Sequence, residues 1–246
     1  MKILVCISKA PDTTSRIAFT DGDTQFDANG VQFIVNPYDE WYALVRALEL
    51  KEQQGGSVTI VTVGGADSEP IMRKALAIGA DDAVRIDVDP QDALETATLI
   101  ANHAQGEGYD LILCGKETID HNGSVVGAMV AELMDMAYVS LATSLDVEGS
   151  TAKAKREASG GIEAVEASLP VVVSASKGMA EQRIPNMRGI MAARSKPLNV
   201  VSAEGGKQGS QVSKFELPPA KGECKMVPAD NPAELVRLLR EEAKVL

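Results

Sequence analysis

The residues best suited to hold a ligand follow a short apolar run near the middle of the chain. Residues 111–114 suit a strand that is buried on both faces, and the pair Gly115-Lys116 ends it. A polar loop then leads to residues 125–134, whose apolar side chains recur with the spacing of one helix face. A strand, a glycine turn and a helix in this order present backbone N–H groups to a ligand phosphate. The alternative is an ordinary connection between a strand and a helix that binds nothing.

Strands and helices alternate along the first part of the chain, and this alternation decides where the loop lies. Strands are expected at residues 3–7, 57–63, 83–86 and 111–114, each followed by a helical stretch. Residues 1–136 therefore predict an α/β fold with a doubly wound, mostly parallel sheet. The strand ends at 7–9, 63–66 and 115–118 would meet at one carboxyl edge, where open sheets of this kind bind ligands. This position favours a binding loop over an ordinary connection.

Three polar residues are predicted to cap helices. Asn36 precedes a helical stretch that would have Pro37 at its first position and the acid Asp39 in its first turn. Ser68 and Asp89 are expected to cap the next two helices in the same way. The first helix should therefore start directly after residue 36.

Two regions depart from the alternation. Residues 13–35 contain the turn pairs Asp21-Gly22 and Asn29-Gly30, which predict an antiparallel excursion before the first helix. Past residue 138 the regular alternation stops. A turn at 159–161 is expected there between two edge strands, and residues 171–175 should return to the core.

The last seventy residues have little regular pattern. Residues 176–200 contain prolines, glycines and methionines without a clean period, and we expect an exposed, partly helical loop. Residues 203–212 are rich in Gly, Ser, Gln and Lys, a composition typical of linkers. A last helix is expected at about 232–245, after the cap Asn231. We therefore divide the chain into an α/β domain at 1–200 and a C-terminal arm at 201–246, whose helix must dock on the domain or on a partner.

The composition argues against several kinds of partner and site. The net charge of −11 and the isoelectric point near 4.7 argue against nucleic acid and against an anionic membrane surface. Cys6, Cys114 and Cys224 form no C-x-x-C pair, so we expect free thiols in a reducing compartment. The amino end does not match a signal peptide, and no stretch reaches the ~20 apolar residues of a membrane span. We expect a protein of the cytoplasm or an organelle matrix, without direct membrane insertion.

Patterns for catalysis and for the common nucleotide sites are missing from the sequence. It has neither a G-x-G-x-x-G fingerprint nor a P-loop. His103 and His121 have no cysteine cluster nearby, which argues against a metal site. No nucleophile is paired with a base. The residues alone thus predict a nucleotide-binding module without catalytic groups of its own.

Several short motifs occur in an order and spacing found in one protein family. They are Asn36-Pro37-Tyr38-Asp39-Glu40, ALAIGAD at 75–81, GKETID at 115–120, the stretch from Arg156 through Gly160-Gly161 and Glu163 to 169–173, RGIMAA at 188–193, and Pro218-Pro219. With these motifs the chain resembles the beta (small) subunit of electron-transfer flavoproteins across nearly its whole length. The resemblance implies a Rossmann-like, adenine-nucleotide-binding fold. It also implies a heterodimer with a larger alpha subunit that holds most of the FAD.

The resemblance further implies that the beta subunit buries an AMP that does no chemistry. The nucleotide would contact the ends of three strands, the start of the first helix and the polar loop. These positions are Cys6, Asn36, Pro37, Tyr38, Asp39, Val63, Gly115, Lys116, Glu117, Thr118, Ile119, Asp120, His121, Asn122, Gly123, Ser124, Val125 and Val126. Tyr38 matches an aromatic position that approaches the flavin ring, although it is equally suited to simple packing at a helix start.

A second site is implied for residues 176–196, which we name the docking segment. It matches a loop that docks on partner dehydrogenases, with Met187 in the place of an apolar anchor. A flexible thioether on a loop fits pockets of differing shape, as in binders with many partners. The docking residues implied here are Arg183, Met187, Arg188, Ile190 and Met191.

The sequence departs from the family pattern where the nucleotide phosphate would lie. Ser124, Val125 and Val126 stand where many members have Asn, Gln and Thr, so the hydroxyl of Ser124 and backbone N–H groups would hold the phosphate. AMP, a second FAD and an empty site all remain open on the residues alone.

The resemblance implies an electron carrier. It would accept electrons from flavin dehydrogenases, such as the acyl-CoA dehydrogenases of fatty acid oxidation, and pass them towards a membrane quinone oxidoreductase. The nearest alternative is a bifurcating electron-transfer flavoprotein with a second FAD and NADH as donor. An alternative of another class is a stand-alone adenine-nucleotide sensor. The linker and the terminal helix argue against the sensor, because they suit a partner subunit.

Overall fold

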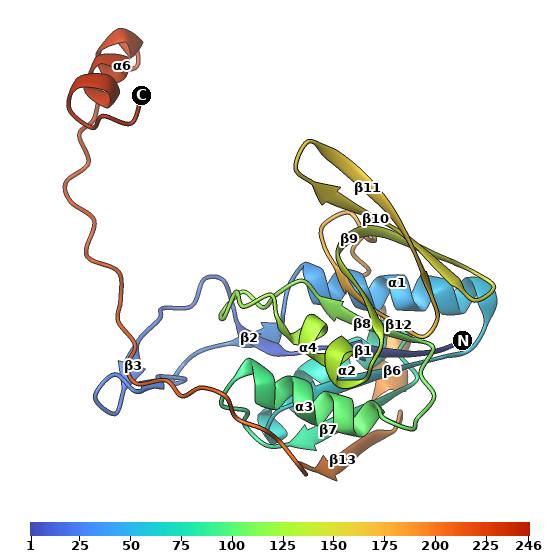
Figure 1. Cartoon of the computed structure of the whole chain (residues 1–246). Coiled ribbons are helices and arrows are strands. Elements are labelled where there is room, and N and C mark those ends of the chain that lie inside the picture. The colour runs from blue at the N-terminus through green and yellow to red at the C-terminus, as the bar shows by residue number, and fades with distance from the viewer.

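The computed structural model describes all 246 residues, and its centre is a nine-stranded sheet in the order β11-β10-β9-β12-β8-β1-β6-β7-β13 (Figure 1). The six strands from β12 to β13 are parallel to one another. They are β12 (Val171–Ala175), β8 (Leu111–Gly115), β1 (Lys2–Cys6), β6 (Ser57–Val63), β7 (Asp82–Asp87) and β13 (Leu198–Ser202). The expected doubly wound, mostly parallel sheet is confirmed.

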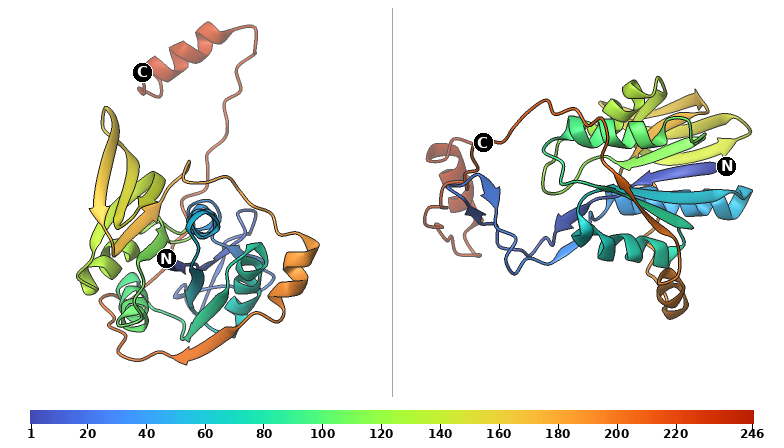
Figure 2. Two further views of the ribbon diagram at one scale, coloured as in Figure 1. Left: turned by 90° about the vertical axis from the view of Figure 1, so that its right-hand side faces the viewer. Right: turned by 90° about the horizontal axis from the view of Figure 1, so that it is seen from below.

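Helices cover both faces of this sheet (Figure 2). One face packs on α1 (Asp39–Gln54) and α2 (Glu69–Ile78), and the other on α3 (Ala93–Ala104) and α4 (Val126–Leu133). Residues of β1 alternate between the two cores: Ile3 and Val5 belong to the first, and Leu4 to the second. A strand buried on both faces reads as a continuous apolar run, which explains why β1 and β8 could be predicted.

The excursion before the first helix consists of two small antiparallel pairs. β2 (Lys9–Pro11) pairs with β5 (Phe33–Val35), and β3 (Phe19–Thr20) pairs with β4 (Gln25–Phe26). Gly22 lies in the turn between β3 and β4 with a φ of 68°, a conformation that suits glycine. The predicted antiparallel excursion is confirmed.

The antiparallel end of the sheet is larger than expected. β10 (Thr151–Ala158) and β11 (Gly161–Ser168) form the expected hairpin around residues 159–161. β9 (Ala137–Glu148), which the sequence did not reveal, joins this hairpin to β12. β13 was also missed, because it lies in the region expected to be a loop and pairs only with β7. Both strands are partly exposed, so neither shows a buried run.

Two of the three predicted caps, Asn36 and Asp89, are wrong, and the third, Ser68, has the predicted position without a capping bond. α1 begins at Asp39, after Tyr38, so Asn36 and Pro37 lie outside the helix. Ser68 precedes α2 but makes no capping bond, because a short 3₁₀ turn (Ala66–Ser68, η1) already gives it helical backbone angles. α3 is capped by Asp92, whose side chain accepts from the N–H of Glu95.

The C-terminal arm leaves the body and carries α6 (Pro232–Glu241) at its end, away from the sheet (Figures 1 and 2). The helix starts after the predicted cap Asn231. The side chain of Asp92 accepts from the N–H groups of Gly209 and Ser210, and the ring of Phe215 stacks on Phe19 with centroids 4.9 Å apart. The arm is therefore tied to the body up to about residue 215. None of the helices is long and apolar enough to cross a membrane.

Candidate functional site

Three of the predicted ligand residues lie at the carboxyl ends of neighbouring strands. Cys6 ends β1, Val63 ends β6 and Gly115 ends β8, and β1 lies between the other two in the sheet. Cys6 and Cys114 are both buried, and a hydrogen bond to Cys114, together with burial, raises the pKa of the Cys6 thiol well above its ordinary value. Both thiols are free and buried beneath this edge of the sheet, and the raised pKa disfavours the reactive thiolate form of Cys6.

Asn36 ties the polar loop to the start of α1. Its Nδ2 donates to the carbonyl of Glu117 at 3.0 Å, and its Oδ1 accepts from the N–H of Ile119 at 2.9 Å. The residue has no exposed surface. Its amide therefore serves a loop eighty residues away instead of capping the helix that follows it. This contact brings the predicted Asn36–Asp39 and 115–120 segments together.

Gly115 lets the loop approach α1 closely. A Cβ on this residue would lie 2.6 Å from Cγ of Glu40 and 2.8 Å from its backbone nitrogen. Glu40 itself is buried, and its carboxylate accepts from the N–H and from the hydroxyl of Ser8, both at 2.7 Å. Burial raises the pKa of Glu40 well above its ordinary value. Glu40 and Ser8 were not among the predicted site residues, because an acid in the first turn of a helix is usually exposed.

The charged groups of the loop are already paired with one another. Lys116 Nζ lies 3.0 Å from a carboxylate oxygen of Glu117 and 4.0 Å from one of Asp39. The hydrogen bond to Glu117 raises the pKa of Lys116, and the bonds from Lys116 and Ser124 lower the pKa of Glu117. Burial raises the pKa of Asp39, against the effect of Lys116. Lys116, the one lysine or arginine of the loop, is thus already paired, and the imidazole of His121 is exposed beside Asp120.

The start of α4 can receive an acceptor group of a ligand. Val125 precedes the helix, so no side chain caps it, and the N–H groups of its first turn have no partner within the helix. Gly127 keeps this turn against the sheet, because a Cβ there would lie 3.2 Å from the ring of Tyr138. Asn122 and Ser124 have φ angles of 50° and 54°, which are strained for residues with side chains and common in binding loops. The residues present thus fit a nucleotide whose phosphate accepts from backbone N–H groups.

Ser124 is bonded to another residue of the loop. Its hydroxyl donates to Oε2 of Glu117 at 2.8 Å, across the loop. The carbonyl of Thr118 accepts from the N–H of Asn122 at 2.9 Å, which closes a turn within the loop. The remaining predicted residues, Thr118 to Gly123, belong to this turn and its end. A phosphate that binds Ser124 therefore has to displace the carboxylate of Glu117.

Tyr38 lies apart from the polar loop. Its φ of 65° turns it outward, and 61% of its surface is exposed. It lines an open cavity of about 360 Å³ together with Trp41, Tyr42 and Gln182. The predicted site is therefore split between the loop and this aromatic cavity. A second cleft, of about 680 Å³ between α3 and β13, contains none of the predicted residues.

The docking segment lies on α2 and contains α5 (Met187–Ala193). Met187 is 74% exposed, and Ile190 and Met191 are exposed as well. Ile184, which was not among the predicted residues, is the most exposed apolar side chain of the segment at 81%. An isolated isoleucine before a proline in a polar stretch could have indicated it. Arg183 is turned to the body, where it pairs with Glu52, while Arg188 is exposed.

Comparison with known proteins shows the family of the chain. Residues 23–205 match the model of the electron transfer flavoprotein domain. The chain is 36% identical to the electron transfer flavoprotein subunit beta of Bacillus subtilis, with both chains covered completely. It is also 36% identical to that of Syntrophomonas wolfei over 90% of this chain and 87% of the relative, and 30% identical to that of Bradyrhizobium diazoefficiens over the whole of both. The chain therefore belongs to the electron transfer flavoprotein family, among its beta subunits.

Proposed function

We propose that this chain is the nucleotide-holding and docking half of a two-subunit electron carrier. The observation that carries the proposal is the uncapped start of α4 at the carboxyl edge of the sheet, next to a loop that Asn36 holds in place. An FAD held mostly by the alpha subunit supplies the redox chemistry, and this chain contributes binding and orientation. Electrons come from flavin dehydrogenases, such as acyl-CoA dehydrogenases, and go towards a membrane quinone oxidoreductase.

The nucleotide on this chain is AMP, with its phosphate at the start of α4. The backbone N–H groups of that turn and the positive end of the helix dipole favour an anion. Gly115 at the end of β8 and the buried Asn36 hold the loop against the body of the domain, next to the proposed ligand. In this proposal the nucleotide is structural, and the redox chemistry belongs to the flavin.

A second FAD is the other candidate for this site. A phosphate monoester carries a charge of about −1.5 to −2 at neutral pH, whereas each phosphate of a dinucleotide carries about −1. Lys116 is already paired with Glu117 and Asp39, so the loop offers little cationic charge to a dianion. A second FAD would make the protein a bifurcating carrier that takes electrons from NADH, but its two phosphates together carry about −2, so the charge of the loop does not favour it over AMP.

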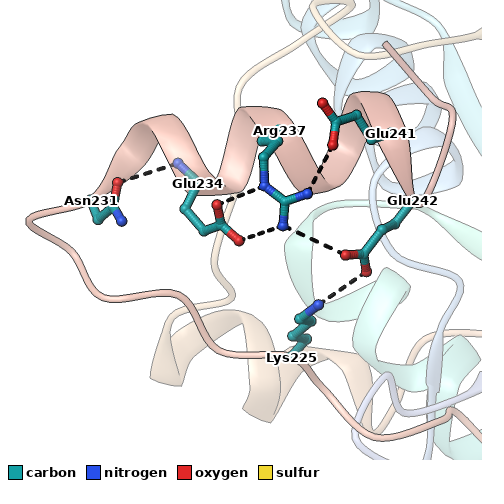
Figure 3. Close-up of polar contacts among 6 residues, drawn as sticks. All are labelled: Lys225, Asn231, Glu234, Arg237, Glu241 and Glu242. Atoms are coloured by element: carbon teal, nitrogen blue, oxygen red, sulfur yellow. Dashed lines mark hydrogen bonds and ion pairs between the residues drawn. The ribbon is translucent and has the colours of Figure 1, made fainter.

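The C-terminal arm is the part of this chain that binds the alpha subunit. Arg237 of α6 bonds to Glu234 and Glu241, and its other neighbour Glu242 pairs with Lys225 (Figure 3). The polar groups of the helix are thus satisfied among themselves, while apolar side chains of the arm are exposed. These are Leu217, Met226, Leu235, Val236, Val245 and Leu246. A helix of ten residues is marginal alone in water, so it needs a partner surface to pack on.

Coexpression with the alpha subunit tests the proposal. The purified pair should be yellow and contain FAD, while this chain expressed alone should be colourless and poorly soluble. Denaturing the pair and quantifying the released nucleotides identifies the ligand: one FAD and one AMP support the ordinary carrier, and two FAD support the bifurcating carrier. A stable, soluble monomer that does not bind the alpha subunit would overturn the proposal and favour a stand-alone nucleotide sensor.

A further inference from the structure

Arg183 holds the docking segment on α1, just before the exposed apolar residues of the segment. Its guanidinium donates to both carboxylate oxygens of Glu52, at 2.6 and 3.1 Å. Its backbone carbonyl accepts from Nε1 of Trp41 at 3.2 Å. A guanidinium that bonds to both oxygens of a carboxylate fixes the relative orientation of the two groups as well as the distance between them.

The two contacts of Arg183 lie far apart on the helix. Trp41 and Glu52 are eleven residues apart in α1, which corresponds to about 16 Å along its axis. The backbone of Arg183 is therefore held near the start of α1, and its side chain is held near the end. Arg183 lowers the pKa of Glu52, so the pair is charged at neutral pH. These two contacts fix the position and direction of the backbone just before Ile184.

The carboxyl end of the docking segment is held on α2. Arg73 donates to the carbonyls of Ala193 and Lys196 at 2.8 and 2.7 Å. Lys196 Nζ donates to the carbonyls of Leu76 and Ala80, at the end of α2, at 2.9 and 2.5 Å. The segment between these ties is thus fixed at both ends, and its exposed apolar side chains lie between them.

The middle of the segment touches the body through a glycine. A Cβ on Gly189 would lie 2.2 Å from the carbonyl oxygen of Ala77 in α2. Backbone therefore packs directly on backbone here, and the side chains of Met187 and Met191 remain exposed. The exposed apolar side chains are presented by a supported backbone and do not hang from a free loop.

We propose that Glu52 and Arg183 are positioning residues that form a strut, which sets Ile184 and Met187 in the geometry for docking before a partner arrives. A surface ion pair of this exposure contributes little to global stability. Ordering a loop on binding, in contrast, reduces affinity, and a segment that is ordered beforehand avoids that loss. The strut therefore acts on partner affinity more than on folding. This inference rests on the proposed docking function.

The test uses Glu52→Gln in the assembled alpha–beta carrier, with the acyl-CoA dehydrogenase of the source organism as electron donor. The KM for the carrier should rise about three- to tenfold, in line with the loss of order in one or two side chains. The kcat, the FAD content and the melting temperature should stay unchanged. Hydrogen exchange of residues 182–193 should become faster in the same sample.

Glu49→Gln is the matched control, because Glu49 is an acid of the same helix that pairs with Arg46 and makes no hydrogen bond to Arg183, although its charge also acts on that residue. A double-mutant cycle completes the design: Arg183→Gln and the double variant should show the same KM as Glu52→Gln, since each removes the same contact.

Three results would overturn the strut. They are an unchanged KM and exchange rate in Glu52→Gln, an equal rise in KM in Glu49→Gln, and additive effects in the double variant. Ile184→Ala and Met187→Ala separate this failure from a failure of the docking function. If they raise the KM while Glu52→Gln does not, only the strut is wrong; if they also leave it unchanged, the docking function itself falls.

Discussion

Replacing Asn36 by alanine should release the polar loop from the body. The side chain makes two hydrogen bonds to backbone groups of the loop, one to the carbonyl of Glu117 and one from the N–H of Ile119. Alanine can make neither bond. The fully buried position of Asn36 means that water does not replace the amide without a rearrangement of the loop.

The expected loss is about 2–4 kcal/mol. Leaving a buried donor or acceptor without a partner costs about 1–3 kcal/mol for each group. Two groups are affected here, and both are partly buried, so the lower half of that range applies to each. At about 1.4 kcal/mol for each factor of ten, the N–H of Ile119 should lose about thirty- to thousandfold of its protection against hydrogen exchange.

Hydrogen exchange and nucleotide content of the purified alpha–beta carrier measure this effect. The peptide that covers residues 116–125 should exchange faster in Asn36→Ala, and less nucleotide should be released per complex on denaturation. Asn36→Asp gives a second reading. It retains an acceptor for Ile119 but places a carboxylate against the carbonyl of Glu117. Burial raises the pKa of such an acid, so this variant should be less impaired at pH 5.5, where the protonated acid can donate, than at pH 8.

Asn29→Ala is the matched control. Its side chain donates to Asp27 within an exposed turn at 2.7 Å and supports no distant segment. Substitutions at such positions change stability by about 0.5 kcal/mol or less. If Asn36→Ala leaves loop exchange and nucleotide content the same as Asn29→Ala does, the loop does not depend on this amide and the reasoning is refuted.

Four further substitutions test other parts of the structure. Gly115→Ala should lower the free energy of unfolding by about 1–3 kcal/mol, measured in urea, and reduce nucleotide content, because the new Cβ would meet Glu40 at 2.6 Å. The difference in free energy of unfolding between Glu40→Gln and the unchanged protein should shift in favour of the variant as the pH rises from 5 to 8. A carboxyl whose folded pKa lies well above its ordinary 4.5 loses stability as the pH rises through that window, and glutamine does not titrate. Ile184→Ala and Met187→Ala should each raise the KM for the carrier about three- to tenfold at constant FAD content, because each removes an exposed apolar anchor.

Each of these predictions has a control or a contrary result. Gly123→Ala adds a methyl group with only Val125 near it, at 3.8 Å, and should be close to neutral. Parallel stability curves of Glu40→Gln and the unchanged protein would show that Glu40 is not protonated in the folded state. Ile162→Ala removes an isoleucine that is 71% exposed from the β10–β11 hairpin, and an equal rise in KM there would remove the docking role of Ile184.

The parallel part of the fold could be predicted because its signals are local. β1, β6 and β8 are short apolar runs, and the helices between them repeat apolar residues at helical spacing. β9 and β13 lack such runs, since exposed residues interrupt both. Their place in the sheet depends on strands far away in the sequence: β9 on β12, and β13 on β7.

The candidate site divides in the same way. The order of strands placed Cys6, Val63 and Gly115 at one edge, and this part was correct. The partners of individual side chains were not predicted, because local rules assigned Asn36 to the nearest helix and overlooked Glu40. A capping pattern is defined by residues that are neighbours in sequence. A buried amide such as that of Asn36, in contrast, bonds to backbone groups that are close only in the folded structure.

The sequence by itself determined most of the parallel strands of the sheet, its hairpin and the place of its carboxyl edge. These follow from hydrophobic periodicity, glycine turns and chain order, all of which act over a few residues. Only the tertiary structure decided three side-chain contacts. The amide of Asn36 bonds to the polar loop, the hydroxyl of Ser124 donates to Glu117, and Arg183 of the docking segment pairs with Glu52 of α1. Each of these bonds joins groups whose distance is set by packing, so no local pattern contains it.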